Sequence, residues 1–311
     1  MNFQQLEYII AVDTYRHFAQ AAEKSFITQA TLSMMIQKLE SELGIKIFDR
    51  SRQPVTPTEI GIKIIEQARR IISESRRMKE IITEEKGEVR GELKVGIIPT
   101  LAPYLLPLFL KKFSEEYPLV KLNISEHTTI TIIQKLKSAQ LDAGILATPL
   151  NDNSIKEQPL FFEKYYLYVN SKEKGFDNRY VLPSSIDINR LWLLEEGHCM
   201  RSQILNLCEL KKAHAGKEKI HYEAGSIETL KNIVEKNFGI TIIPELATFN
   251  LSPSQKKRLR YFKSPSPVRE ISIITHREYI KIALIDALKE MILSVIPGGM
   301  KSPKDVEVID F

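Results

Sequence analysis

The stretch FAQAAEKSFITQATLSMMIQKLESELG, residues 18–44, decides the fold of the first part of this chain. Thr28 is placed to begin a helix, because its side-chain oxygen can accept from the unpaired N–H groups of a first turn. Gly44 is placed to end that helix, because glycine tolerates the left-handed conformation of a C-terminal stop. Between them, apolar residues recur at helical spacing and predict a buried stripe. The stripe consists of Leu32, Ile36, Leu39 and Leu43.

Two shorter helices are predicted before this one. Asn2 can cap the first, and the small residues Ala21 and Ala22 let another helix approach the second closely. Two helices, a tight turn and a third helix with a polar outer face are typical of a helix-turn-helix, whose last helix enters the major groove of DNA. The alternative is a three-helix bundle with a solvated face. The residues expected to contact DNA are Thr28, Gln29, Thr31, Ser33, Gln37 and Lys38.

A wing is predicted directly after the third helix. Residues 45–50 and 55–56 have the composition of two short strands around a Pro-containing tip. Arg50 and Arg52 lie at that tip, where they are placed to reach phosphate or a narrow minor groove. Residues 1–58 are therefore expected to form a winged helix-turn-helix.

A long helix is predicted next, with Thr58 as its cap. Its apolar residues alternate at spacings of four and three, which is a heptad pattern over roughly three heptads. We favour a dimerising coiled coil over a helix packed on its own domain, because a DNA-binding module needs a partner to read two half-sites. Residues 59–87 are assigned to this linker helix and to a hinge at its end. The heptad residues are Ile64, Ala68, Ile71, Ser75, Met78 and Ile82.

Strands and helices alternate through residues 88–296, with short apolar runs such as 191–194 and 220–223 as strands. This order predicts an α/β domain of parallel sheets with helices on both faces, and ligand sites beyond the carboxyl ends of its strands. Thr100 and Thr129 each follow a predicted strand, so we expect them to face one cleft. The alternatives are a turn residue for Thr100 and a helix cap for Thr129. Residues 297–311 are polar and are expected to be a flexible tail.

The overall charge of +5 over 311 residues permits DNA binding but does not require it. Residues 1–90 hold 14 Lys and Arg against 13 Asp and Glu, so the N-terminal net charge is 14 − 13 = +1. The DNA-binding prediction therefore rests on pattern. Two basic clusters, residues 211–219 and 256–260, are most simply solvated surface. No apolar run is long enough to span a membrane and the N-terminus lacks the features of a signal peptide, so we expect a cytoplasmic protein.

The chain has two cysteines, Cys199 and Cys208, in a Cys-x8-Cys segment. Three interpretations remain open: a redox pair, two unreactive buried side chains, or a zinc site, for which this spacing is unusual. Helical spacing after Cys199 predicts that it lies at a helix N-terminus, where the helix dipole lowers a thiol pKa; His198 and Arg201 could lower it further. If the helix reaches Cys208, the two residues are about 13 Å apart, whereas a disulfide needs Cα atoms within roughly 7 Å. Oxidation would then have to unwind this segment.

The N-terminal region resembles the LysR-type transcriptional regulators. The resemblance implies a two-lobed regulatory domain like a periplasmic binding protein, and assembly as a dimer of dimers. Ala30 departs from the family, which often has proline there, and Met34 and Met35 stand where polar residues are usual. The matching segments are residues 18–22, 28–33, 36–40, 43–44 and 48–50, with Thr58 and Gly61.

The cysteine segment is similar to that of the peroxide-responsive members of the same family, through Gly197, His198, Cys199, Arg201 and Gln203 with Cys208 following. Residues 98–100, 103–107, 141–142 and 226–230 match as well. This resemblance implies that Cys199 attacks peroxide and that Cys208 then forms a disulfide with it. It also implies a peroxide pocket, which comprises Thr100, Thr129, His198 and Arg269.

The predicted function is a redox-controlled activator of oxidative-stress genes rather than an enzyme, with no cofactor and no metal. Its expected partners are a double-stranded DNA operator, further copies of the chain, RNA polymerase, hydrogen peroxide and a thiol reductant system, with no membrane. One alternative is a regulator of the same family that binds a small organic inducer between its lobes. Another, from a different class, is a thiol peroxidase, against which the helix-turn-helix argues.

Overall fold

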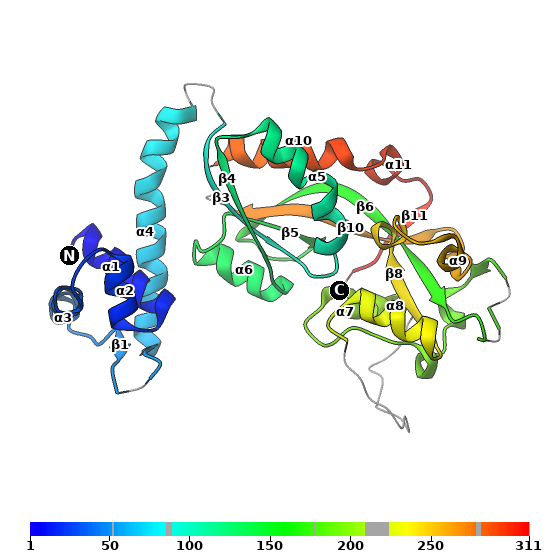
Figure 1. The fold of residues 1–311 in the computed structure, drawn as a ribbon, viewed down its shortest axis with the longest axis horizontal. Coiled ribbons are helices and arrows are strands. Elements are labelled where there is room, and N and C mark those ends of the chain that lie inside the picture. The colour runs from blue at the N-terminus through cyan, green and yellow to red at the C-terminus, as the bar shows by residue number, and fades with distance from the viewer. Residues whose placement is uncertain are drawn as a thin grey trace. The chain divides into compact units, whose positions relative to one another are not determined.

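The computed structural model describes residues 1–51, 53–84, 89–173, 175–176, 178–208, 224–277 and 281–310. Within α4, the side chains of residue 73 and residues 76–84 are outside this description. The chain forms two compact units, one built mainly from residues 1–88 and the other mainly from residues 89–311 (Figure 1). Each unit is described by itself.

The N-terminal unit contains the three predicted helices: α1 (Phe3–Tyr15), α2 (Phe18–Lys24) and α3 (Gln29–Leu43). Asn2 caps α1 in a reciprocal capping box with Gln5, and the Thr28 hydroxyl accepts from the Thr31 N–H at 3.2 Å. Gly44 ends α3 in the left-handed conformation, with φ of 69°. These local hydrogen bonds fix the helix boundaries that the sequence predicted.

The buried stripe of α3 is one residue shorter than predicted. Leu32, Ile36 and Leu39 are fully buried, but Leu43 is 37% exposed and lies outside the core cluster of this unit. The buried face of α3 ends at Leu39 and Glu40, one turn before Leu43. The Glu40 carboxylate accepts from the backbone N–H groups of Ile47 and Phe48, at 2.8 and 3.3 Å, and so ties α3 to the wing.

The wing is an antiparallel pair of two-residue strands, β1 (Phe48–Asp49) and β2 (Thr56–Pro57), which is shorter than predicted. The linker helix α4 (Glu59–Glu84) starts at the predicted cap, where the Gly61 N–H donates to the Thr58 hydroxyl at 3.0 Å.

One edge of α4 packs on its own unit. Ile65, Ala68 and Ile72 are buried in the same core cluster as α1 and α3, while Ile64 and Ile71 are only partly buried against it. Ala68, one of the predicted heptad residues, is buried on this edge. For this edge the less favoured alternative, a helix that packs on its own domain, is therefore correct. The coiled coil stays a prediction for the other edge. The Met78 and Ile82 side chains and the hinge lie outside the described residues.

The C-terminal unit is built on a mixed sheet with the strand order β4-β3-β5-β10-β6-β9-β7. In the first lobe β3, β4 and β5 are parallel, as predicted, but β10 pairs antiparallel with both β5 and β6. The prediction of purely parallel sheets is wrong, because the long strands β6 and β10 run through the centre of the unit in opposite directions and join its lobes (Figure 1). The elements of this lobe are β3 (Gly91–Ile97), α5 (Ala102–Glu116), β4 (Val120–Glu126), α6 (Thr129–Lys137), β5 (Ala143–Thr148), β6 (Ile155–Val169), β10 (Ser266–His276) and α10 (Ile282–Val295).

The second lobe surrounds the far ends of β6 and β10. Its predicted strand at 191–194 is reduced to two isolated bridges, Leu191 to Ile240 and Leu194 to Ala224, and the predicted strand at 220–223 lies outside the described residues. The elements are β7 (Tyr180–Val181), α7 (Cys199–Leu207), α8 (Ile227–Lys236), β8 (Ile240–Pro244), α9 (Pro253–Lys256) and β9 (Leu259–Phe262), with short 3-10 helices at Pro183–Ser185, Ile188–Arg190 and Glu245–Thr248.

The tail is ordered, contrary to the prediction of a flexible segment. It forms α11 (Gly298–Lys301) and β11 (Val306–Val308), and β11 pairs in parallel with β10. The Ile309 N–H donates to the Val268 carbonyl at 2.9 Å, and the Ile309 side chain is buried. Polar composition failed as a signal here because backbone pairing and one apolar side chain hold the segment. Among the described helices none is long and apolar enough to cross a membrane.

Candidate functional site

Cys199 is the first residue of α7, as predicted, and His198 is its N-cap. Gly197 enters the helix with φ of 98°, a conformation that glycine adopts without strain. Met200 and Ile204 bury one face of α7 in the second lobe. The geometry therefore presents the Cys199 thiol at a helix N-terminus.

Arg269 is the central cation of this region and is completely buried. Its Nε and Nη2 donate to Glu163 Oε2 at 2.9 and 2.7 Å, and its Nη1 and Nη2 donate to the hydroxyl and carbonyl of Thr100 at 3.0 and 3.3 Å. Glu163 is buried as well and accepts from the Leu246 N–H at 2.9 Å. The arginine on β10 thus joins β6 to the loop after β3.

The pKa of Cys199 is raised, not lowered as predicted. Burial is the largest effect and raises this pKa, although the residue as a whole is partly exposed. The Arg269 guanidinium and then a hydrogen bond from Thr129 act in the opposite direction, and so do N–H groups at the start of α7. The loss of water around the sulfur, which cannot be inferred from the position at a helix end, outweighs the effect of the helix N-terminus.

The cation predicted to act on Cys199 is also different. Arg201 turns away and donates to the Leu194 carbonyl at 2.7 Å, so its charge is used to hold the loop before α7. His198 is buried, with Nε2 3.6 Å from Glu195 Oε1. Arg269, which is 70 positions further along the chain, is the cation that acts on the thiol.

Thr100, in the loop after β3, and Thr129, the first residue of α6, approach the same centre, as expected from their positions after strands. Thr100 is buried and bound to Arg269, while the Thr129 hydroxyl is buried and has no hydrogen-bond partner that meets ordinary geometric limits within the described part of the chain. The Thr129 hydroxyl nevertheless lies close enough to Cys199 to lower its pKa. A buried hydroxyl without a full partner beside a thiol leaves a hydrogen-bonding position for a small polar ligand.

Cys208 lies at the other end of α7, as its C-cap. It is only 5% exposed and belongs to the apolar core of the second lobe, and this burial raises the pKa of its thiol to about 12. Both thiols are free. A helix from Cys199 to Cys208 separates the two residues by about 13 Å of rise, so they cannot form a disulfide while α7 persists.

The C-terminal tail is bonded to the helix between the two cysteines. Gln203 is fully buried; it accepts from the Tyr165 hydroxyl at 2.7 Å and donates to the Ile309 carbonyl at 2.8 Å. Asn206 donates to the Asp310 carbonyl at 3.2 Å. Figure 1 shows the C-terminus beside α7. Unwinding of α7 would therefore also break these two hydrogen bonds to the tail.

Sequence reasoning missed Glu163 and the role of Gln203. Glu163 had a usable signal, because it alternates with Phe161 and Tyr165 on the buried face of β6, where a carboxylate requires a charged or hydrogen-bonding partner. Gln203 stood in the motif without an assigned role. Its partner Ile309 lies in the tail, which sequence reasoning took to be flexible.

The predicted DNA-contacting side chains of α3 are exposed, apart from Ser33, which is partly buried. Arg50, predicted to reach phosphate or a narrow minor groove, makes contacts with α2 and α3 that the sequence did not predict. It donates to Ser33 Oγ at 3.1 Å and to the buried Glu40 at 3.2 Å, and it lies over the Phe18 ring at 5.0 Å from the ring centre. The buried Glu40 carboxylate pairs with the Arg50 guanidinium and holds it against α3. Arg52 lies outside the described residues.

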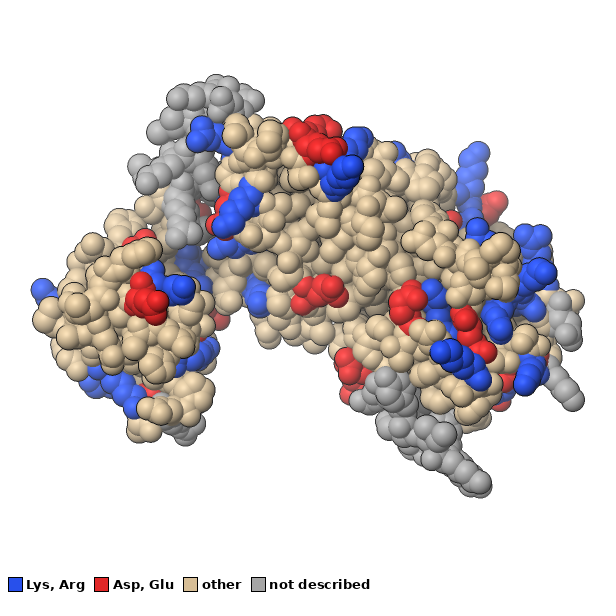
Figure 2. Space-filling model, viewed as in Figure 1, with Lys and Arg blue, Asp and Glu red and all other residues tan. Residues whose placement is uncertain are grey.

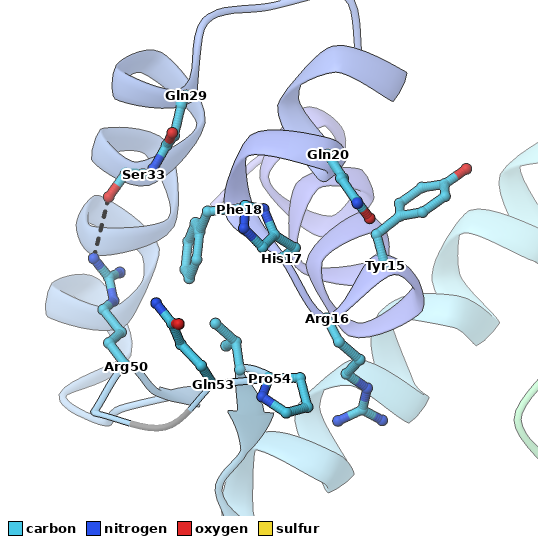
Figure 3. Close-up of a pocket in the computed structure, with 11 residues that line it drawn as sticks. Tyr15, Arg16, His17, Phe18, Gln20, Gln29, Ser33, Arg50, Gln53 and Pro54 are labelled. Carbon is cyan, nitrogen blue, oxygen red and sulfur yellow. Dashed lines mark hydrogen bonds between the residues drawn. The ribbon is translucent and has the colours of Figure 1, made fainter.

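A cavity of about 580 Å³ opens between α2, α3 and the wing. Arg50 and Gln53 from the wing face Phe18 and Gln29 across this space (Figure 3). Elsewhere on the surface, Figure 2 shows Lys and Arg interspersed with Asp and Glu on the C-terminal unit. Within the described residues, no group of three or more His, Cys, Asp or Glu side chains could hold a metal ion.

Two family models match the chain. The model for the bacterial regulatory helix-turn-helix protein of the lysR family matches residues 3–62, and the LysR substrate binding domain matches residues 86–296. The chain belongs to the LysR family. The predicted family, the winged helix-turn-helix with a two-lobed α/β domain, and the assignment as a DNA-binding regulator rather than an enzyme are thereby confirmed.

Individual relatives within the LysR family are named as peroxide-responsive regulators. The chain is 33% identical over 306 residues to the "Hydrogen peroxide-inducible genes activator" of Haemophilus influenzae, which covers 96% of this chain and 99% of that protein. It is 34% identical to the "DNA-binding transcriptional dual regulator OxyR" of Escherichia coli, over 88% of this chain and 89% of that protein. The resemblance to the peroxide-responsive members is confirmed.

Solved structures agree with these relatives. A full-length OxyR variant from Pseudomonas aeruginosa superposes with a TM-score of 0.81 at 29% identity, over 95% of this chain and 99% of that chain. Reduced OxyR from Porphyromonas gingivalis superposes with a TM-score of 0.63 at 31% identity, over 70% of this chain and 100% of that chain.

Proposed function

We propose that this chain is a hydrogen-peroxide-sensing transcriptional regulator, an activator of oxidative-stress genes, switched by a reversible disulfide between Cys199 and Cys208. One observation supports this most directly. A free thiol lies at the start of α7 beside the buried Arg269, and a second free thiol lies at the end of the same helix. The names of the relatives support the choice of peroxide as the signal.

The proposed chemistry has two steps. The Cys199 thiolate attacks one oxygen of hydrogen peroxide; the O–O bond breaks, the sulfur is oxidised to a sulfenic acid, and the other oxygen takes up a proton and leaves as water. The Cys208 sulfur then attacks the sulfenic sulfur, an S–S bond forms, and the sulfenic oxygen leaves with protons as a second water. A thiol reductant system reverses the switch by supplying two electrons and two protons.

The pocket residues have distinct proposed roles. Arg269 favours the thiolate of Cys199 through its charge, and the buried Thr129 hydroxyl beside the thiol bonds peroxide as it approaches the sulfur. Thr100 holds the guanidinium in place and, with His198, lines the approach to the thiol. Because burial raises the Cys199 pKa even beside Arg269, the thiolate is the minor and reactive species at neutral pH.

Disulfide formation requires α7 to unwind, since the two residues are about 13 Å apart along it. Cys208 must leave the apolar core, and the bonds of Gln203 and Asn206 to the tail must break. The disulfide thus selects a second conformation of the regulatory domain, which is the requirement for a switch.

The proposed output is altered binding to a double-stranded DNA operator. The exposed residues of α3 would read bases and the wing would contact phosphate. We propose a dimer of dimers that contacts RNA polymerase differently when oxidised. The proposed place of action is the bacterial cytoplasm, because that compartment holds the DNA.

The test is peroxide induction of a reporter controlled by the promoters that the chain occupies in its own host. We expect the wild-type chain to induce the reporter after micromolar peroxide, and Cys199→Ser to abolish induction while DNA binding persists. Full induction with Cys199→Ser would favour an organic inducer instead. Rapid multiple turnover of peroxide with a dedicated reductant would favour a thiol peroxidase.

A further inference from the structure

Met34 is the most exposed large apolar side chain on α3. It is 60% exposed, whereas Met35 beside it is partly buried against the core of the unit. A methionine in this position gains nothing from the fold of the unit itself. It also differs from its exposed neighbours Thr31, Gln37 and Lys38, which are all polar.

The position of Met34 on the helix is the crest of the DNA-facing surface. At about 100° per residue, Met34 lies roughly 140° to 160° around the helix from each of Leu32, Ile36 and Leu39, the buried stripe. A recognition helix enters the major groove with the face opposite its core. Met34 therefore lies at the middle of the face of α3 that would meet the base edges.

The chemistry of that side chain restricts what it can read. A thioether is a flexible apolar group with a weak acceptor and no donor. In the major groove only thymine presents an apolar group, its C5-methyl, while G·C pairs present polar atoms that an apolar side chain would leave without partners.

We infer that Met34 is a specificity-determining residue that selects an A·T pair in each half-site by packing on the thymine methyl group. This inference rests on the proposed DNA-binding function. The smaller Ala30, one turn earlier in the same row and also exposed, leaves the space that the methionine needs to lie along the groove.

The test uses the full-length chain and a randomised 40-base-pair duplex library. Repeated selection on the wild-type protein yields a bound sequence, in which each thymine is then replaced singly by uracil, which lacks the methyl group. We expect one position per half-site at which uracil weakens binding about four-fold, the equivalent of one buried methyl group. Met34→Gln should remove this uracil effect and change the base selected at that position.

Leu43→Gln is the matched control. Leu43 is on the same helix and exposed, but lies nine residues on and so about 180° away from Met34. This variant should keep both the wild-type sequence preference and the uracil effect. The inference is overturned if no uracil substitution affects the wild-type protein, or if Met34→Gln retains the effect. If the selection enriches no sequence at all, both the DNA-binding proposal and the Met34 inference are overturned. This outcome differs from the two above, in which a sequence is enriched and only the Met34 inference fails.

Discussion

The link between α7 and the C-terminal tail predicts how truncation of the tail changes the redox equilibrium. Deleting residues 304–311 removes the carbonyl groups of Ile309 and Asp310, to which Gln203 and Asn206 donate at 2.8 and 3.2 Å. These two hydrogen bonds exist only while α7 is a helix. The deletion should therefore destabilise the reduced form relative to the disulfide form.

The expected magnitude follows from the number of bonds. Each hydrogen bond contributes on the order of 1 kcal/mol, so the two together contribute about 2 kcal/mol to the reduced form. For a two-electron couple about 30 mV corresponds to 1.4 kcal/mol, and the reduction potential of the truncated protein should be about 40 mV more negative. The pairing of β11 with β10 is lost in both redox states and does not enter this difference.

The assay is equilibration in dithiothreitol redox buffers, acid quenching, alkylation and quantification of reduced and oxidised protein by mass. Asn206→Ala is the matched control: it removes one of the two bonds and should shift the potential by about half as much. Thermal unfolding checks that the truncated protein remains folded. A potential that is unchanged, or shifted to less negative values, would refute the coupling of the tail to α7.

Three further predictions concern the buried charges and thiols. Above pH 9 the Cys208 thiol ionises in the unfolded chain but not in the folded one, since its folded pKa is about 12. The free energy of unfolding of the reduced wild-type protein should therefore fall between pH 9 and 11. Measured by urea unfolding, this fall should be about 2 kcal/mol larger than the fall for Cys208→Ala. Burial raises the Cys199 pKa above the ordinary range, so the rate of peroxide oxidation should rise about tenfold per pH unit between pH 6 and 8. Stopped-flow experiments measure this rate. A plateau of the rate below pH 7 would show instead that the thiol is already ionised. Arg269→Met should lower the free energy of unfolding by about 3–5 kcal/mol, since it leaves Glu163 buried without its cation. Adding Glu163→Gln to this variant should restore part of the lost free energy. Equal stability of the single and double variants would contradict the ion pair.

The parts of the fold that the sequence predicted well are those set by local hydrogen bonds. Asn2, Thr28 and Gly44 fix the ends of the N-terminal helices through groups within three or four residues, and such rules can be applied without knowing the rest of the fold. The start of α7 at Cys199 follows from the same kind of local pattern.

The errors concern long-range contacts. The pKa of Cys199 depends on burial by segments far along the chain and on Arg269, neither of which is visible in the sequence around the thiol. Likewise β10 separates β5 from β6 only because residues near 270 return to the sheet, and the tail is ordered by that same strand. The bond between Arg50 and the buried Glu40 was not predicted, because the two residues are ten positions apart on different elements.

The central claim is that one peroxide molecule joins Cys199 to Cys208. It is tested most directly by treating the reduced full-length protein with one equivalent of hydrogen peroxide, alkylating free thiols, and mapping peptides by mass spectrometry. We expect rapid loss of both thiols and a peptide pair linked through Cys199 and Cys208. Two cysteines that both remain alkylatable would contradict it.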